Sequence, residues 1–251
     1  MNATERRKKI ELLLTEKKEM DVSEINNMFE VSGVTIRNDL IYLERKGIAK
    51  RLFGKIVLRS DVNYNTALSD SRNIAEKEKI GKYAASLIKP GISVLFYAGS
   101  TTQQIVRFID PDIKFIAVTN SVTIAHELRS LPNASIVMIG GNFSHSVGAT
   151  YGLQAIKQFQ EYNYDLLFLS VDGIDSEMGI TNKQPFESDV NRVIIERSNT
   201  VVVVADNSKI GNVTFVQMGD VTDVDMLITD AKAPSEAIDK IRAKGIQVVT
   251  T

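Results

Sequence analysis

Apolar and polar positions in the first 58 residues predict three short helices followed by a hairpin. Apolar residues recur at helical spacing in residues 5–17 and 22–29, and in a third segment that begins after Ser32. Each helix follows a residue type that favours an N-cap, namely Thr4, Asp21 and Ser32. The run "IAKRLFGKIVL" alternates around Gly54, as two strands joined by a tight turn do. This order of elements is typical of a winged helix-turn-helix.

The third predicted helix has two chemically different faces. Ile36, Leu40 and Leu43 fall within about 40° of one direction, which is the expected core side. On the other side, Arg37 can form a bidentate contact with a base and Asn38 can pair with adenine. A solvated helix face is the alternative, but the basic hairpin that follows favours a DNA groove. The candidate DNA-contacting residues are Ser32, Val34, Thr35, Arg37, Asn38, Arg45, Lys50, Arg51 and Lys55.

Farther along, near-continuous apolar runs that end in small polar residues recur five times. They are "ISVLFYAGS", "IKFIAVTNS", "SIVMIGG", "DLLFLSVDG" and "TVVVVADNS", and helical patterns follow several of them. Parallel strands covered on both faces have this composition. We therefore predict an α/β protein in which a doubly wound parallel-sheet domain follows the winged helix-turn-helix.

Loops at the carboxyl ends of these strands form a candidate ligand site, because ligands of such sheets bind there. Gly99 permits close backbone approach, and the hydroxyl groups that follow it suit a phosphate. Small residues in such loops are also common helix caps, which is the alternative. The candidate ligand-binding residues are Gly99, Ser100, Thr101, Thr102, Thr119, Asn120, Gly140, Gly141, Asp172 and Lys209.

Charge is unevenly distributed, although the net charge is only -1. Residues 1–60 contain 13 Lys and Arg against 9 Asp and Glu, and the remaining residues contain 17 against 22. The basic segment favours a polyanionic partner, with solvated charged helices as the alternative. The sequence "SDVNYNTALSDSRN" is typical of a linker. We expect a DNA-binding domain at 1–59, a linker at 60–73 and an effector domain at 74–251.

Composition excludes several other classes of function. Among the 251 residues there is no cysteine, and the two histidines leave little for a metal centre, so we expect no metal. No GxGxxG or Walker A pattern is present, so we expect no nucleotide cofactor. No apolar run approaches about 18 residues, and "MNATERRKKIELLL" lacks the features of a signal peptide. We expect a cytoplasmic protein without a membrane partner.

The pattern "VS..TIR.DL..LE..G...R", from Val31 to Arg51, is similar to the DNA-binding signature of the DeoR family of bacterial transcriptional regulators. Asn38 stands where the family usually has a second arginine. Phe53, Gly54 and Lys55 stand where it usually has His-Gly-Gly. The resemblance implies an operator-binding winged helix.

Resemblance to the same family continues through "EKEKIGKYAASLIKPG", "VTNSVTIAHEL", "DGIDSEMGIT" and "VVVVADNSKIG". It implies an effector domain that senses phosphorylated sugars and is related in fold to ribose-5-phosphate isomerase and the coenzyme A transferases. It also adds Tyr97 and Asn191 to the ligand site, where many members have an aspartate and a lysine. Asn191 and Arg192, together with "TIRNDL", look more like the branch that governs amino-sugar and sugar-alcohol use, such as the N-acetylgalactosamine regulators.

We therefore predict a transcriptional repressor of a carbohydrate-utilisation operon, with double-stranded operator DNA and a phosphorylated sugar as partners. One winged helix covers little DNA, so we expect a dimer or tetramer. Two alternatives remain: a DNA-binding protein that no ligand controls, and an isomerase-like enzyme with Asp172, Asp175 or Glu187 as base. Tyr97 and Asn191 take ionisable side chains away from the site, so we predict no catalytic residue.

Overall fold

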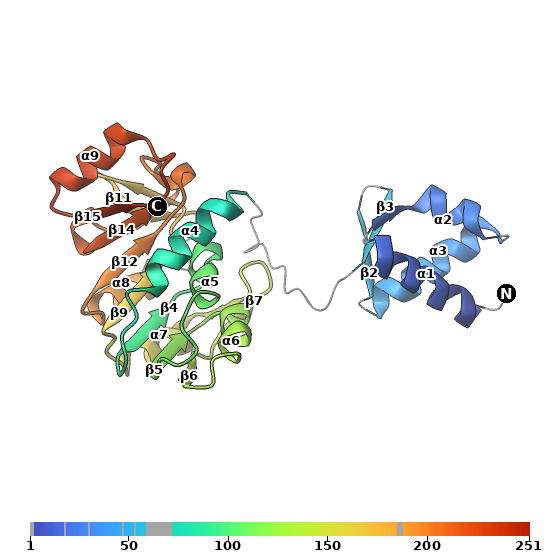
Figure 1. Cartoon of the computed structure of the whole chain (residues 1–251), viewed down its shortest axis with the longest axis horizontal. Helices are drawn as coiled ribbons and strands as arrows, with labels where there is room; N and C mark the ends of the chain where they lie inside the picture. The colour runs from blue at the N-terminus through green and yellow to red at the C-terminus, as the bar shows by residue number, and fades with distance from the viewer. Residues whose placement is uncertain are drawn as a thin grey trace. The chain divides into compact units, whose positions relative to one another are not determined.

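The computed structural model describes residues 3–17, 19–29, 31–46, 48–52, 54–58, 72–184 and 188–251. The chain divides into two compact units, Met1–Asn65 and Thr66–Thr251 (Figure 1). Each unit has a hydrophobic core of its own. Every helix among the described residues is too short or too polar to span a membrane.

The first unit has the predicted order of helices and hairpin. Its elements are α1 (Ala3–Lys17), β1 (Glu19–Asp21), α2 (Val22–Met28), α3 (Gly33–Arg45), β2 (Ala49–Leu52) and β3 (Lys55–Leu58). The strands form an antiparallel sheet in the order β1-β3-β2, of which the sequence pattern does not indicate β1. Ser32 caps α3, since its side chain accepts a hydrogen bond from the backbone N–H of Thr35 at 3.3 Å. Ile36, Leu40 and Leu43 are buried, as their spacing predicts.

The second unit is built around a seven-stranded sheet in which all neighbouring strands are parallel. The order across the sheet is β15-β14-β12-β9-β4-β5-β6. The strands are β4 (Ser93–Phe96), β5 (Phe115–Thr119), β6 (Ala134–Met138), β9 (Leu166–Leu169), β12 (Val201–Val204), β14 (Met226–Thr229) and β15 (Gln247–Thr250). The chain starts in the middle at β4, proceeds to β6 at one edge, and returns to β9 on the other side. The order therefore reverses between β4 and β9, which is the topological switch point.

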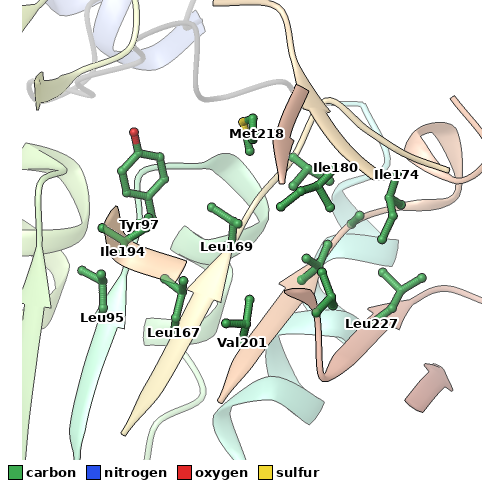
Figure 2. Packing of buried hydrophobic residues seen from close by; sticks show 14 of the residues in the cluster. Leu95, Tyr97, Leu167, Leu169, Ile174, Ile180, Ile194, Val201, Met218 and Leu227 are labelled. Carbon is green, nitrogen blue, oxygen red and sulfur yellow. The ribbon is translucent and has the colours of Figure 1, made fainter. Parts of the chain in front are cut away.

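Helices cover both faces of this sheet. One face carries α4 (Ile74–Ala85), α5 (Ser100–Val106) and α6 (Val122–Leu128), which pack on Val94, Phe96 and their neighbours. The opposite face carries α7 (Leu153–Gln160), α8 (Ser188–Glu196) and α9 (Ser235–Ala243). Figure 2 shows that second cluster, in which Leu95, Leu167 and other side chains of alternate strand positions meet. The predicted doubly wound α/β domain is confirmed.

Short elements complete the second unit at the carboxyl ends of the large strands. One antiparallel hairpin consists of β7 (Asn142–Ser144) and β8 (Ala149–Tyr151). A small antiparallel sheet consists of β10 (Gly173–Asp175), β11 (Gly179–Asn182) and β13 (Val216–Gly219). Two 3-10 turns, η2 (Asn207–Lys209) and η3 (Val221–Asp223), follow β12 and β13.

Candidate functional site

The outer face of α3 is open to solvent. Val34, Arg37 and Asn38 are exposed, while Thr35 is half-buried with its hydroxyl 2.9 Å from that of Ser32. Lys55, at the start of β3, is exposed, and its ammonium lies 2.7 Å from the Glu19 carboxylate. Arg45, Lys50 and Arg51 lie on α3 and β2, but their side chains are outside the described residues, as is Phe53. The described part of this face carries the predicted base-reading side chains.

A buried ion pair holds α3 against α1. The Asp39 carboxylate, on the core side of α3, lies 2.5 Å from Nε of Arg6 and 2.7 Å from Nε of Arg7. The side chains of Arg6 and Asp39 are only 6% and 1% exposed. Arg7 also lies over the ring of Tyr42, 4.1 Å from its centre. The apolar pattern does not reveal this contact, because Asp39 is itself polar and its partners are 32 and 33 positions away.

A cavity of about 510 Å³ opens at the switch point of the large sheet, and we call it the switch-point cavity. The loop after β4 contributes Ala98 and Gly99, the first turn of α5 contributes Ser100 and Thr101, and the segment after β9 contributes Ser170, Val171 and Asp172. Other segments complete the lining with Arg72, Ser146, Val147, Asn182, Lys183, Gln184 and Lys209. The position agrees with the rule that ligands of such sheets bind where the strand order reverses.

Basic side chains outnumber acidic ones around this cavity. Among the described lining residues, Arg72, Lys183 and Lys209 are basic and Asp172 is the single carboxylate. The Lys209 ammonium lies 3.5 Å from one oxygen of Asp172, and the backbone N–H of Lys183 donates to the other oxygen at 3.2 Å. The balance of charge suits an anionic ligand, while the Asp172 carboxylate can accept hydrogen bonds from ligand hydroxyl groups.

Gly99 allows the two central loops to approach closely. A Cβ added at Gly99 would lie 2.3 Å from Cβ of Ser170, so a larger residue cannot be placed there without a shift. The next loop residues use this proximity, because Oγ of Ser170 lies 2.7 Å from Oγ1 of Thr102 and accepts from its backbone N–H at 3.1 Å. Thr102 itself is fully buried and does not line the cavity.

Other sequence-predicted ligand residues lie behind the cavity wall. The hydroxyl of Thr119 donates to the carbonyl oxygen of Phe96 at 2.7 Å. The Asn120 side chain accepts from the backbone N–H of Ala98 at 3.1 Å and donates to the carbonyl of Thr150 at 3.0 Å. These groups are saturated by the backbone of neighbouring loops, so they shape the cavity and are absent from its lining.

The remaining four predicted residues are also absent from the lining. Tyr97 belongs to the hydrophobic cluster that includes Leu95 and Leu167 (Figure 2). Asn191 is buried on α8, with its amide nitrogen 2.9 Å from the sulfur of Met218. Gly140 and Gly141 pack against α7 and β8, where a Cβ at Gly141 would lie 2.6 Å from a backbone oxygen. The cavity thus brings together five predicted residues: Gly99, Ser100, Thr101, Asp172 and Lys209.

A buried carboxylate connects the start of α4 with the turn that carries Lys209. Asp206 accepts hydrogen bonds from Asn73 at 2.8 Å and from the Ser208 hydroxyl at 2.6 Å, and it lies 3.9 Å from the Lys77 ammonium. Burial raises the pKa of Asp206, but the hydrogen bonds from Ser208 and Asn73 outweigh burial and leave this pKa below its ordinary value. Among the described residues other than glycine, Asn73 alone has a positive φ, 56°. The sequence pattern did not indicate that Arg72 and Asn73 lie in this region.

Metal chemistry has no evident site in the part of the chain that the structure describes. No group of three or more His, Cys, Asp or Glu side chains there could hold a metal ion. The chemistry that the switch-point cavity offers is reversible binding of an anion that also bears hydroxyl groups.

Both units match known proteins. Residues 6–62 match the DeoR-like helix-turn-helix domain, and residues 72–231 match the DeoR C terminal sensor domain. The "Putative aga operon transcriptional repressor" of Escherichia coli O157:H7 is 32% identical over 250 residues, which covers 98% of this chain and 93% of that protein. The glycerol-3-phosphate regulon repressor of Escherichia coli K12 is 28% identical, with 99% of both chains covered. Ribose 5-phosphate isomerase A from Methanocaldococcus jannaschii aligns over 55% of this chain and 54% of its own, with 17% identity and a TM-score of 0.40.

Proposed function

Because the chain belongs to the DeoR family of helix-turn-helix transcriptional regulators, we propose that a phosphorylated sugar in the switch-point cavity controls its binding to operator DNA. The chain is a DNA-binding regulator and not an enzyme, in agreement with its relatives, which are named as regulators and repressors. The observation that supports the effector class is the cavity itself, in which three basic side chains surround a loop rich in hydroxyl groups.

Local charge explains how an acidic domain holds an anion. Residues beyond 60 carry a net charge of -5, with 17 Lys and Arg against 22 Asp and Glu, so the domain as a whole repels a phosphate. Binding must therefore come from nearby donors. We place the phosphate beside Lys209, Lys183 and the hydroxyls of Ser100 and Thr101, and the sugar hydroxyls beside Asp172. Relatives named for the aga operon and for glycerol-3-phosphate make hexosamine and polyol phosphates the first ligands to test.

Arg72 is the side chain through which we expect a bound ligand to affect the DNA-binding unit. It lines the cavity and lies two residues before α4, at the first described position of the second unit. A phosphate that attracts the Arg72 guanidinium changes the free energy of conformations at the start of α4. Occupancy of the cavity and DNA affinity are then thermodynamically coupled, with an expected coupling free energy of about 1–3 kcal/mol.

For DNA recognition, we place the exposed face of α3 in a major groove, with Arg37 and Asn38 at base edges and Lys55 at phosphates. Val34, Thr35 and Ser32 lie at the end of α3 that approaches the bases first. The protein acts as a dimer or tetramer, because a single winged helix contacts too short a stretch of DNA for regulatory affinity. Repeated or palindromic half-sites about one helical turn apart follow from this arrangement.

A thermal-shift screen tests the effector. Hexose, hexosamine and hexitol phosphates are compared with their unphosphorylated forms, and a ligand present at 100 times its dissociation constant should stabilise the fold by about 2.7 kcal/mol. Thr101→Val, which removes a hydroxyl from the cavity lining, should weaken phosphate binding. Thr123→Val is the matched control, since the Thr123 hydroxyl has no hydrogen-bond partner in the described part of the chain and is not among the residues of the cavity lining.

Four outcomes contradict the proposal. Protection by neutral sugars equal to that by phosphates rules out a phosphate site, and so does unchanged phosphate binding in Thr101→Val. Operator affinity that does not change with a bound ligand supports the ligand-independent alternative. Turnover of a sugar phosphate by the purified protein supports the isomerase-like alternative.

A further inference from the structure

The large sheet ends at β6, and this edge lacks the usual protection against pairing. An edge strand presents unpaired backbone N–H and C=O groups, which soluble proteins commonly shield with charged side chains, proline or a bulge. β6 has the sequence ASIVM, without charge or proline. Two of its large apolar side chains are exposed, Ile136 to 37% and Met138 to 41%.

Absence of charge extends well beyond the strand. From Ala134 to Ile156 the chain has no Asp, Glu, Lys or Arg, although these residues make up 24% of the whole sequence. At that frequency about five would be expected in a stretch of this length. The stretch covers β6, the β7–β8 hairpin and the first turn of α7. Part of the stretch lies elsewhere, since Ser146 and Val147 of the hairpin line the switch-point cavity, but β6 itself is at the edge. An uncharged edge strand with exposed apolar side chains is typical of a surface that another protein covers.

Exposed apolar side chains lie on both faces of the sheet at this edge. Ile136 pairs in register with Ala117, which packs beneath α4–α6, so Ile136 and Met138 project to that face. Ile116, 44% exposed, is one position away from Ala117 and projects to the opposite face. Side chains of a strand added beside β6 would cover the exposed apolar residues on both faces of the sheet. The backbone of that strand would form hydrogen bonds with the unpaired N–H and C=O groups of β6.

The opposite edge of the sheet differs. At β15 the exposed residues are polar, Gln247 and Thr250, while Val248 and Val249 are partly covered. Exposure of an edge therefore does not by itself produce exposed apolar side chains in this domain. The contrast between the two edges favours β6 as the edge that contacts a partner.

We infer that β6 is the self-association surface of this domain, and that the occupant is β6 of a second copy, antiparallel across a two-fold axis. The inference rests on the oligomer proposed above and identifies its interface. A two-fold interface brings the same patch of two copies together, so a patch with one sign of charge repels its copy, whereas an uncharged patch does not. A surface without charge also has nothing to attract or orient a charged partner.

Sedimentation equilibrium of the full chain and one matched pair of variants tests the inference. Met138→Lys places an unpaired ammonium at the proposed interface, which should weaken dimerisation by about 30-fold or more, as loss of a central interface residue does. Met178→Lys makes the same chemical change at a residue that is 49% exposed. Met178 follows Glu177, whose carboxylate pairs with Lys244 next to the β15 edge, so this variant should dimerise like the unmodified chain.

Cross-linking gives a second measurement that does not depend on an added charge. Because the chain has no cysteine, a single introduced one can be cross-linked only to its counterpart. Residues that face each other across antiparallel strands have Cα atoms about 4.5–5.5 Å apart, within the range of a disulfide. Ser135→Cys, Ile136→Cys and Val137→Cys are oxidised in turn, and at least one should give a covalent dimer, whereas Met178→Cys should not.

Distinct results overturn the inference and the proposed function. If the unmodified chain is a dimer but Met138→Lys dimerises as well as Met178→Lys and no cysteine in β6 cross-links, the interface lies elsewhere. A chain that is monomeric at micromolar concentration overturns the proposed oligomer together with this interface. Cross-linking of Met178→Cys in preference to the β6 variants assigns the contact to the other edge.

Discussion

Asp39→Asn should destabilise the DNA-binding unit without affecting the other unit. In the structure the Asp39 carboxylate is buried between the guanidinium groups of Arg6 and Arg7 and holds α3 against α1. Asparagine keeps the size of the side chain but removes its charge. The Arg6 guanidinium, only 6% exposed, then loses the carboxylate charge that pairs with it in the structure.

The expected loss is large compared with the stability of such a small unit. Removal of one member of a buried ion pair costs about 3–5 kcal/mol. A unit of about 58 residues has a free energy of unfolding of roughly 3–9 kcal/mol, from about 0.05–0.15 kcal/mol per residue. The substitution therefore removes a third or more of that free energy. A loss of 3 kcal/mol corresponds to an increase of about 100-fold in the population of open states.

Amide hydrogen exchange of the full chain measures the loss of stability in each unit separately. Peptides from α1 and α3 should exchange about 100-fold faster in Asp39→Asn, and peptides from β9 and β12 should not change, because the second unit has its own cores. Glu24→Gln is the control. It removes a carboxylate from the exposed Lys17–Glu24 pair in the same unit and should cost at most about 0.5 kcal/mol. Equal exchange in the two variants would show that the buried pair does not hold α3.

Other substitutions separate the parts of the mechanism. Arg37→Ala should cost about 1–3 kcal/mol of specific DNA affinity and relax sequence preference, whereas Lys55→Ala should weaken all DNA nearly equally and reduce the salt slope by about one; footprinting on specific and random DNA distinguishes them. Gly99→Ala should abolish the effector response in a thermal-shift assay while DNA binding persists, because the new Cβ would lie 2.3 Å from that of Ser170; normal ligand binding would contradict the close approach. The pKa of Asp206 is lower in the folded protein than in the unfolded chain. Ionisation of Asp206 therefore stabilises the fold at pH values above the pKa of the unfolded state. This stabilisation is lost as the pH falls through the pKa of the folded state. Asp206→Asn should therefore flatten the acid limb of the stability profile followed by circular dichroism, and an unchanged limb would exclude this role.

The parts of the fold that could be predicted depend on residues that are close together in the sequence. The cap at Ser32 and the apolar stripe of Ile36, Leu40 and Leu43 involve residues at most 11 positions apart, so their pattern is visible in sequence. Strand β1, only three residues long, was not predicted because it is defined by its pairing with β3, more than 30 positions later. The buried Asp39 was missed for the same reason. Its burial depends on arginines from another helix.

The sequence could predict which loops form the switch-point cavity, but not which of their side chains line it. Strands of a parallel sheet end at the same edge, so Gly99, Ser100, Thr101 and Asp172 could be placed together from sequence. Whether a polar side chain points into the cavity depends on which backbone groups lack a partner. Sequence does not show that Ala98 needs an acceptor, which Asn120 supplies. Arg72 could not be found by the strand-end rule, because it precedes the first strand of the sheet.

Residues behind the cavity wall determine the shape of the site that the ligand meets. Asn120 joins the loop after β4 to β8 through Ala98 and Thr150, and Thr102 joins the same loop to the segment after β9 through Ser170. Together these hydrogen bonds set the separation of the two segments that form the switch-point cavity. A buried amide that loses one partner costs about 1–3 kcal/mol, so each bond resists displacement of the loop. If the proposed sugar phosphate binds in this cavity, we expect its selectivity to depend on these buried contacts as well as on Lys209 and Asp172, which line the cavity.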